Sequence, residues 1–214
     1  MAKDPSPYPV DLVIDYPDHP LNRLTTAFRI ILVIPIVIIL MLVSGSTPSQ
    51  HDEAFRAVYG AGGIIFLPAL LMILFRGKYP RWWFDWNTAL LGFSLRVSAY
   101  MAFLRDEYPS AEENQSVHLT IAYPDVKADL KRGLPIVKWF LAIPHYVVLI
   151  GLVIAVIVCS IIAWFAILFT GRYPRSLFNF VVGVLRWQTR IIAYAFLLTT
   201  DRYPPFKLLE APGA

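Results

Sequence analysis

The chain has 214 residues, of which 57% are hydrophobic and only 16% are charged, a composition too apolar for an ordinary soluble domain. Its formal net charge is +4, but the basic residues flank apolar segments instead of forming one long soluble basic face. The composition therefore predicts an integral membrane protein whose cations meet anionic lipid headgroups, and it argues against a nucleic-acid partner.

Each half of the chain begins with a short segment that predicts a β-strand. The start of the chain, Met1–Pro5, is polar and proline-rich, so we expect no cleavable signal peptide there. Residues 10–18 (VDLVIDYPD) partly alternate apolar and polar side chains and end at Tyr-Pro, where proline stops regular pairing. Residues 117–125 (VHLTIAYPD) repeat this pattern. We expect the two strands to pair with each other.

Long apolar stretches follow the predicted strands, and we predict that each folds into a helical hairpin. In the second half the stretch runs from Ile136 to Phe169, and one straight helix of that length would reach ~50 Å against a hydrocarbon core of ~30 Å. In the first half a polar insertion at residues 45–59 predicts a water-exposed loop between two arms. The alternative is a single long tilted helix. Pro35 and Pro144 predict matched kinks.

A third helix is predicted to close each half, at residues 87–104 and 181–198. Each carries an arginine near its middle, Arg96 and Arg190, and a lone arginine at the bilayer centre costs at least ~2.5 kcal/mol. We therefore predict amphipathic helices that lie at the membrane interface. Asp85 and Asn179 are expected to cap their first turns.

Five blocks of sequence recur in the same order in the two halves. They are 10–18 with 117–125, 32–35 with 141–144, 74–86 with 168–180, 96–100 with 190–194, and 106–109 with 201–204. Because chance does not produce five ordered matches, we predict a tandem duplication with units 1–109 and 110–214. The predicted fold class is an all-α membrane protein with minor β. Each unit contains an extended segment, an apolar helical hairpin and an amphipathic third helix.

The blocks 169–175 (FTGRYPR), 178–180 (FNF) and 201–206 (DRYPPF) resemble the bacterial membrane-protein family known as domain of unknown function 4389. Both units are similar to it over most of their length, the second more closely. The first departs at Lys78, at Trp82 and Trp83, and in its long loop. The resemblance implies a fold and a membrane location, and it brings no established activity.

The recurring Gly-x-Tyr-Pro-Arg signature ends the apolar stretch of each unit. Gly77 and Gly171 predict left-handed helix ends, and this structural role explains much of the signature by itself. The functional hypothesis is that the cations form two neighbouring cradles for lipid phosphates. Their residues are Arg76, Lys78, Arg81, Arg172 and Arg175. The aromatic residues predicted to anchor the chain at the interface are Tyr79, Trp82, Trp83, Trp86, Tyr173 and Trp187.

Charge also predicts an orientation. Arg23 and Arg29 precede the first apolar stretch, Lys131 and Lys138 precede the second, and both signatures are basic. By the positive-inside rule we predict a multi-pass protein of the bacterial cytoplasmic membrane, with both termini and both signatures cytoplasmic.

No catalytic or metal-binding pattern is apparent in the sequence. Cys159 is the only cysteine, the histidines lack metal-ligand spacing, and no phosphate-binding loop is present. We therefore expect no enzyme activity, no cofactor and no metal. The leading prediction is an accessory or scaffold subunit that binds membrane lipids and other membrane-protein subunits. The alternatives are a membrane-shaping hairpin protein and a small transporter or channel.

Overall fold

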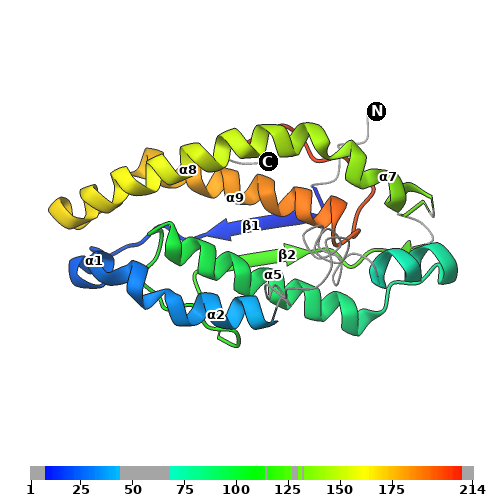
Figure 1. Ribbon diagram of the computed structural model, residues 1–214, viewed down its shortest axis with the longest axis horizontal. Helices are drawn as coiled ribbons and strands as arrows, with labels where there is room; N and C mark the ends of the chain where they lie inside the picture. Colours follow the sequence, from blue (N-terminus) through cyan, green and yellow to red (C-terminus); the bar gives the residue numbers. More distant parts are fainter. Residues whose placement is uncertain (1–7, 44–67, 114, 127–129, 132, 209–214) are drawn as a thin grey trace, which may run out of the picture.

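The structure is a computed structural model that describes residues 8–43, 68–113, 115–126, 130–131 and 133–208. The first unit contains β1 (Val10–Ile14), α1 (Arg23–Leu32), α2 (Ile34–Val43), the π-helical turn η1 (Met72–Arg76) and α5 (Arg81–Met101). The second contains β2 (Val117–Ile121), α7 (Leu134–Leu141), α8 (Ile143–Thr170) and α9 (Arg175–Ala195). In Figure 1 the two strands lie in the middle, between α8 and α9 on one side and α2 and α5 on the other.

A two-stranded antiparallel sheet joins the two halves of the chain. β1 pairs with β2 in a register that sets Leu12 opposite Leu119 and Ile14 opposite Val117. Because successive side chains of a strand point to opposite faces, Leu12 and Ile14 are buried while Asp11 is exposed. The predicted pairing of the two strands is confirmed.

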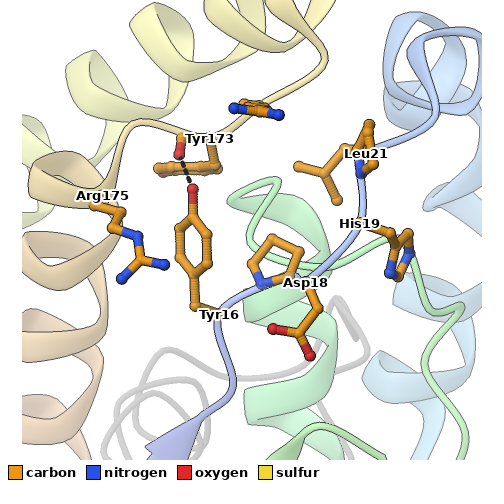
Figure 2. Close-up of a pocket in the computed structure, with 9 residues that line it drawn as sticks. Tyr16, Asp18, His19, Leu21, Tyr173 and Arg175 are labelled. Atoms are coloured by element: carbon orange, nitrogen blue, oxygen red, sulfur yellow. Dashed lines mark hydrogen bonds between the residues drawn. The ribbon is translucent and has the colours of Figure 1, made fainter.

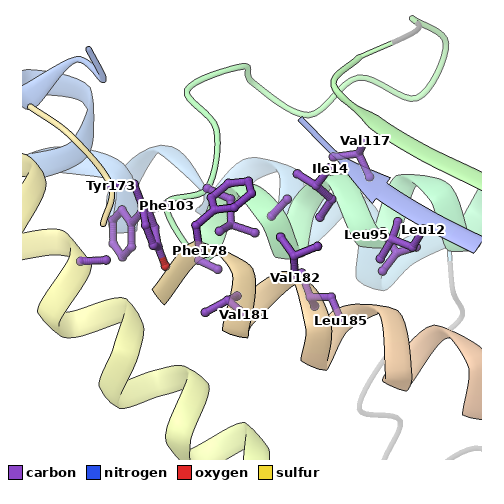
Figure 3. Close-up of a cluster of buried hydrophobic side chains, with 14 of the residues drawn as sticks. Leu12, Ile14, Leu95, Phe103, Val117, Tyr173, Phe178, Val181, Val182 and Leu185 are labelled. Atoms are coloured by element: carbon purple, nitrogen blue, oxygen red, sulfur yellow. The ribbon is translucent and has the colours of Figure 1, made fainter. Parts of the chain in front are cut away.

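The hydrophobic core lies on the apolar face of this sheet. α9 packs on β1 and α5 packs on β2, so both helices cover the same face. Figure 3 shows Leu12 of β1 gathered with Leu95 of α5 and with Val182 and Leu185 of α9. Each large side chain withdrawn from water in this way contributes roughly 1.5–3 kcal/mol.

α5 and α9 are therefore interior helices, largely buried against the rest of the protein, and their predicted position at a membrane interface stays a prediction. The arginines that motivated that prediction contact groups of the protein itself. Arg190 is 2% exposed, with its guanidinium 5.5 Å from the ring centre of Tyr8. Arg96 donates a hydrogen bond to the carbonyl oxygen of Ser110 at 2.8 Å. A cation held by protein groups does not have to be kept away from the core.

Both interior helices also begin earlier than predicted. Pro80 and Pro174 are their N-cap residues. Asp85 and Asn179 therefore lie inside the helices and do not cap them, and Asp85 faces Arg81 one turn before it at 3.9 Å. Proline pre-sets the backbone for helix entry without needing an amide partner, which explains the earlier start.

The apolar stretch of the second unit is a continuous helix, so the predicted hairpin is wrong there. α8 runs for 28 residues from Ile143 to Thr170, with Pro144 in its first turn, where a missing amide hydrogen costs least. Apolar side chains specify no turn, so the hydrogen-bonded helix continues. In the first unit α1 and α2 meet at a bend of 42° beside Pro35. The predicted loop at residues 45–59 lies outside the described residues.

One helix in the described part of the chain is long and apolar enough to cross a membrane. It comprises α7 and α8, residues Leu134–Thr170. The bent pair α1–α2 would make a second if it counts as one span. This finding gives weak support to membrane association.

The apolar helices form the outer layer of the fold. α8 packs on α9 and α1, and α2 packs on α5 and α1, so α9 and α5 lie between these helices and the strands. The outward side chains of α8 are apolar and exposed, Ile150 and Ile154 among them at 66% and 59%. The contacts therefore lead from β1 through α9 to α8 and from β2 through α5 to α2, and the outer helices carry bare apolar surface.

Candidate functional site: two matched basic pockets

Each Gly-x-Tyr-Pro-Arg signature forms a sharp turn between an outer helix and an interior helix. Gly77 has φ of 58° and Gly171 has φ of 73°. These left-handed values are strained for any residue with a Cβ, which confirms the predicted role of both glycines as helix ends. The turn leaves the arginine or lysine after each glycine exposed at the end of a helix.

The second signature faces the extended segment of the first unit across a cavity of about 270 Å³, here called pocket A. The residues that line it are Tyr16, Pro17, Asp18, His19, Pro20, Leu21, Arg172, Tyr173 and Arg175. Figure 2 shows Tyr16 standing beside Arg175 with its hydroxyl directed at Tyr173. Pocket A therefore takes its walls from both halves of the chain.

Three contacts fix the shape of pocket A. The Tyr16 hydroxyl donates a hydrogen bond to the carbonyl oxygen of Tyr173 at 2.5 Å. The guanidinium of Arg175 lies 4.6 Å from the ring centre of Tyr16, a cation–π distance, and Phe178 meets the same ring edge-on at 5.0 Å. These contacts hold Arg175 beside the pocket in a defined position.

The first signature forms a matching cavity of about 470 Å³, here called pocket B. Its lining residues are Gly77, Lys78, Tyr79, Tyr123, Pro124, Asp125 and Val126. The Tyr123 hydroxyl donates a hydrogen bond to the carbonyl oxygen of Tyr79, and Arg81 lies 4.9 Å from the Tyr123 ring centre. Each contact has its counterpart in pocket A at a matched position of the recurring sequence blocks.

Pocket A carries more positive than negative charge. Arg172 and Arg175 are exposed on one side, opposite Asp18. The Arg23 guanidinium also lies against Gly171, within 3.7 Å of the position that a Cβ there would occupy. Burial raises the pKa of the Tyr173 hydroxyl, and the neighbouring Cys159 adds to this, so the tyrosine stays neutral. The excess of guanidinium groups suits an anion.

A buried ion pair lies near the end of each interior helix. In the first unit Arg29 pairs with Asp106, and the same carboxylate accepts a hydrogen bond from the backbone amide of Asn22. In the second half of the chain Nζ of Lys138 lies 2.7 Å from Oδ1 of Asp201. The other carboxylate oxygen, Oδ2, accepts a hydrogen bond from the backbone amide of Lys131. The two pairs occupy matched positions in the two halves of the sequence.

These ion pairs correct part of the charge argument for orientation. Arg29 and Lys138 are 1% and 0% exposed. Because their charges are neutralised inside the protein, they do not face anionic headgroups and are not free markers of a cytoplasmic surface.

The predicted cationic residues divide between the two pockets. Arg172 and Arg175 line pocket A, and Lys78 lines pocket B, with Arg81 against its Tyr123 wall. Arg76 is exposed at the end of η1 and lines neither pocket.

The two signatures do not lie near one another, contrary to expectation. Gly171 ends α8 directly, whereas Tyr79 packs with Leu130 and donates a hydrogen bond to the carbonyl of Leu197 beside the start of α7. The two signature turns therefore lie at opposite ends of the α7–α8 helix (Figure 1), and each pocket lies beside the turn that lines it. A continuous helix separates what a hairpin would have brought together.

The predicted aromatic anchors fall into two groups. Trp82 is 70% exposed and Trp86 38%, with the half-buried Trp83 stacked on Trp86, so these side chains remain available to an interface. Tyr79, Tyr173 and Trp187 are 3%, 1% and 4% exposed. Burial gives these last three a packing role, because a side chain enclosed by protein presents almost no surface to lipid.

Sequence reasoning missed the contribution of the Tyr-Pro-Asp segments and the particular partners in both ion pairs. Tyr16 and Tyr123 recur at matched positions, as do Asp106 and Asp201. The recurrence of a cation at positions 29 and 138 was the sequence signal that could have indicated the two ion pairs. What the sequence did not indicate is that the partners come from different blocks, and for the pockets from different units.

Among the described residues, no group of three or more His, Cys, Asp or Glu side chains is arranged to hold a metal ion.

Residues 135–207 match the model of a family described as a domain of unknown function, DUF4389. The match covers about a third of the chain and includes α8, the second signature and α9, within the second half alone. No curated protein and no solved structure matches the chain.

Proposed function

We propose that this chain is a membrane-embedded accessory or scaffold protein, without catalytic activity, that binds anionic lipid headgroups in pockets A and B. The observation that carries the proposal is the pair of exposed guanidinium groups of Arg172 and Arg175 that line pocket A, at the end of a bare apolar helix. The Arg23 guanidinium lies close by, against Gly171. A phosphate held there keeps its acyl chains beside α8, and arginine binds phosphate oxygens with two parallel hydrogen bonds.

The proposal includes a tandem duplication with units 1–109 and 110–214. Its support is the agreement between sequence blocks and contacts, because the ion pairs and the tyrosine hydrogen bonds recur at matched positions. Equivalent contacts predict equal effects, so Tyr16→Phe and Tyr123→Phe should each lower the unfolding free energy by about 1 kcal/mol. A loss confined to one of them would contradict the equivalence.

Lipid selectivity tests the headgroup proposal. Purified protein in nanodiscs of phosphatidylcholine with added phosphatidylglycerol is examined by native mass spectrometry for retained lipid. We expect selective retention of phosphatidylglycerol. Replacing Arg172 and Arg175 by alanine removes two charges of ~1 kcal/mol each, so affinity at that site should fall about thirtyfold.

The control removes the same number of charges outside the pockets. Arg76 and Lys207 are exposed cations that line neither pocket, and their double alanine variant should retain phosphatidylglycerol like the parent chain. Equal losses in the two double variants would reduce the effect to general charge attraction. No preference for phosphatidylglycerol in the parent chain would reject the headgroup sites.

A second candidate function is membrane shaping, which the exposed apolar faces of α8 and α2 favour. Apolar helices inserted from one side enlarge one leaflet and bend a bilayer. Electron microscopy of liposomes at high protein density tests this candidate, because vesicles that stay spherical and keep their size would exclude it.

A further inference from the structure

Two of the outer elements carry apolar faces that the described residues leave uncovered. On α8 the exposed side chains include Val147, Ile154 and Phe165, and on the α1–α2 pair they include Ile31 and Ile38. Contiguous apolar surface of this extent is rare on a soluble protein. Hydrocarbon chains of lipid are the occupant whose chemistry matches a surface without polar groups.

The face of the sheet that points away from the interior helices carries exposed polar and charged side chains. Asp11, Asp15 and His118 are 50%, 54% and 55% exposed on that face, with His118 and Asp15 only 3.1 Å apart. A two-stranded sheet also has two outer edges whose backbone groups lack a strand partner, and lipid-exposed sheet edges do not occur in the hydrocarbon region. This face of the molecule therefore belongs in water.

A crossing α8 would place the polar face at the wrong depth. The strands run alongside α8 in Figure 1, with α9 between them. Arg186, near the middle of α9, donates a hydrogen bond to the carbonyl of Leu12 and lies 3.8 Å from Asp11. With α8 across the bilayer, the half-exposed carboxylate of Asp11 would lie near its centre, where a charge that is not enclosed by protein costs at least ~2.5 kcal/mol on insertion scales.

We infer that the chain occupies one leaflet, with α8 and the α1–α2 pair lying along the membrane plane and the sheet turned towards water. The inference rests on the proposed membrane residence. The layer order of the fold satisfies it, because the interior helices separate the polar sheet from the outer apolar helices. Half-immersed helices of this kind sink ~5–10 Å into the boundary between headgroups and acyl chains.

This placement deepens the headgroup proposal. Pockets A and B lie at opposite ends of the α7–α8 helix, so a crossing helix would expose them on opposite sides of the membrane. A helix that lies in the plane presents both pockets to the same layer of headgroups. The molecule then binds anionic lipids at two separate points of one leaflet.

Cysteine accessibility distinguishes the two placements. In a Cys159→Ala background, single cysteines replace four exposed residues: Lys78 at pocket B, Arg172 at pocket A, Thr120 on the polar sheet face and Ile154 on the apolar face of α8. A membrane-impermeant maleimide is applied to intact cells and to inverted membrane vesicles. Far-UV circular dichroism and gel filtration in mild detergent verify that each variant folds like the parent chain.

We expect positions 78, 172 and 120 to react in the same one of the two preparations. Position 154 should react in neither until detergent is added. Reaction of positions 78 and 172 in different preparations would overturn the inference, as would a position 120 that stays protected in both.

A carbonate wash before labelling separates failure of the inference from failure of the proposed function. Retention after the wash together with labelling from opposite sides rejects only the single-leaflet placement. Release of the chain by the wash rejects membrane embedding itself. Loss of phosphatidylglycerol selectivity with unchanged labelling rejects only the headgroup sites.

Discussion

The first and second halves of the chain each hold a buried cation near the end of an interior helix, with different chemistry. Arg29 pairs with Asp106 and also donates to the carbonyl oxygens of Arg105 at 2.9 Å and Tyr100 at 3.3 Å. Its guanidinium further lies 4.5 Å from the Tyr100 ring centre. Lys138 has the Asp201 carboxylate, the carbonyl oxygen of Thr200 at 2.7 Å, and a ring, that of Tyr194, at 5.2 Å. The arginine spreads its charge over more partners than the lysine does.

This difference shows which part of the arrangement is essential. Both units place a cation beneath the turn that ends the interior helix, where backbone carbonyls point inward. The carboxylate then neutralises the positive charge that the carbonyl dipoles do not offset. The lysine should depend on its carboxylate more strongly than the arginine depends on its own.

The largest expected effect is that of Asp201→Ala. Removing the carboxylate leaves Lys138 buried and unpaired, which costs about 3–5 kcal/mol of unfolding free energy. Urea unfolding in mild detergent, followed by far-UV circular dichroism, measures the loss. The double variant Lys138→Met with Asp201→Leu should recover most of it, because no charge then remains buried. A loss below about 1 kcal/mol for Asp201→Ala would break the comparison.

Asp106→Ala should have a smaller effect, about 2 kcal/mol, in the same unfolding experiment. Arg29 keeps both carbonyl acceptors and the Tyr100 ring after the carboxylate is removed. A loss larger than that of Asp201→Ala would show that the additional partners of the arginine do not share its charge.

The interior helices themselves differ in how closely other backbone approaches them. A Cβ on Gly183 of α9 would lie 2.7 Å from the carbonyl oxygen of Leu208, whereas one on Gly92 of α5 would meet nothing within 4 Å. Gly183→Ala should cost about 1 kcal/mol, because the segment around Leu208 has to shift. Gly92→Ala should be neutral or stabilising, since alanine favours helices. Equal effects in the unfolding experiment would contradict the close approach at Gly183.

The smallest expected effect concerns an acid that only the first unit carries. Partial burial raises the pKa of Glu107, but hydrogen bonds from Arg105 and Ser116 outweigh it and lower the pKa to about 2. A lowered carboxyl pKa stabilises the fold above the unfolded value of 4.5, and the contribution disappears as the pH falls towards 2. The side chain is 39% exposed, so screening keeps the contribution below about 1 kcal/mol.

Glu107→Gln removes this carboxylate. The second half of the chain has no matching acid, because Arg202 stands at the corresponding position. The difference in unfolding free energy between the parent chain and the variant should be present at neutral pH and shrink as the pH falls below about 4.5. A difference that does not change with pH would contradict the hydrogen-bonded carboxylate.

The sequence by itself determined the features that local backbone chemistry and repetition encode. Alternation around Leu12 and its match in the second half predicted the strands and their pairing, because period-two patterns need a sheet with one buried face. Gly77 and Gly171 predicted helix ends, since few other residues accept a left-handed backbone. The tyrosine and the basic residues of the signature recur in both halves as well, and their roles at headgroups and at an interface stay predictions.

Only the tertiary structure decided how these parts meet. Hydropathy does not distinguish a continuous helix from a hairpin, because both bury or expose the same apolar side chains, and α8 settled that choice for the second unit. The continuous helix placed the two pockets at opposite ends. Segments far apart in the chain supply the ion-pair partners of Arg29 and Lys138. The contact between Tyr16 and Arg175 likewise joins distant segments. Such contacts follow from packing, which no local pattern records.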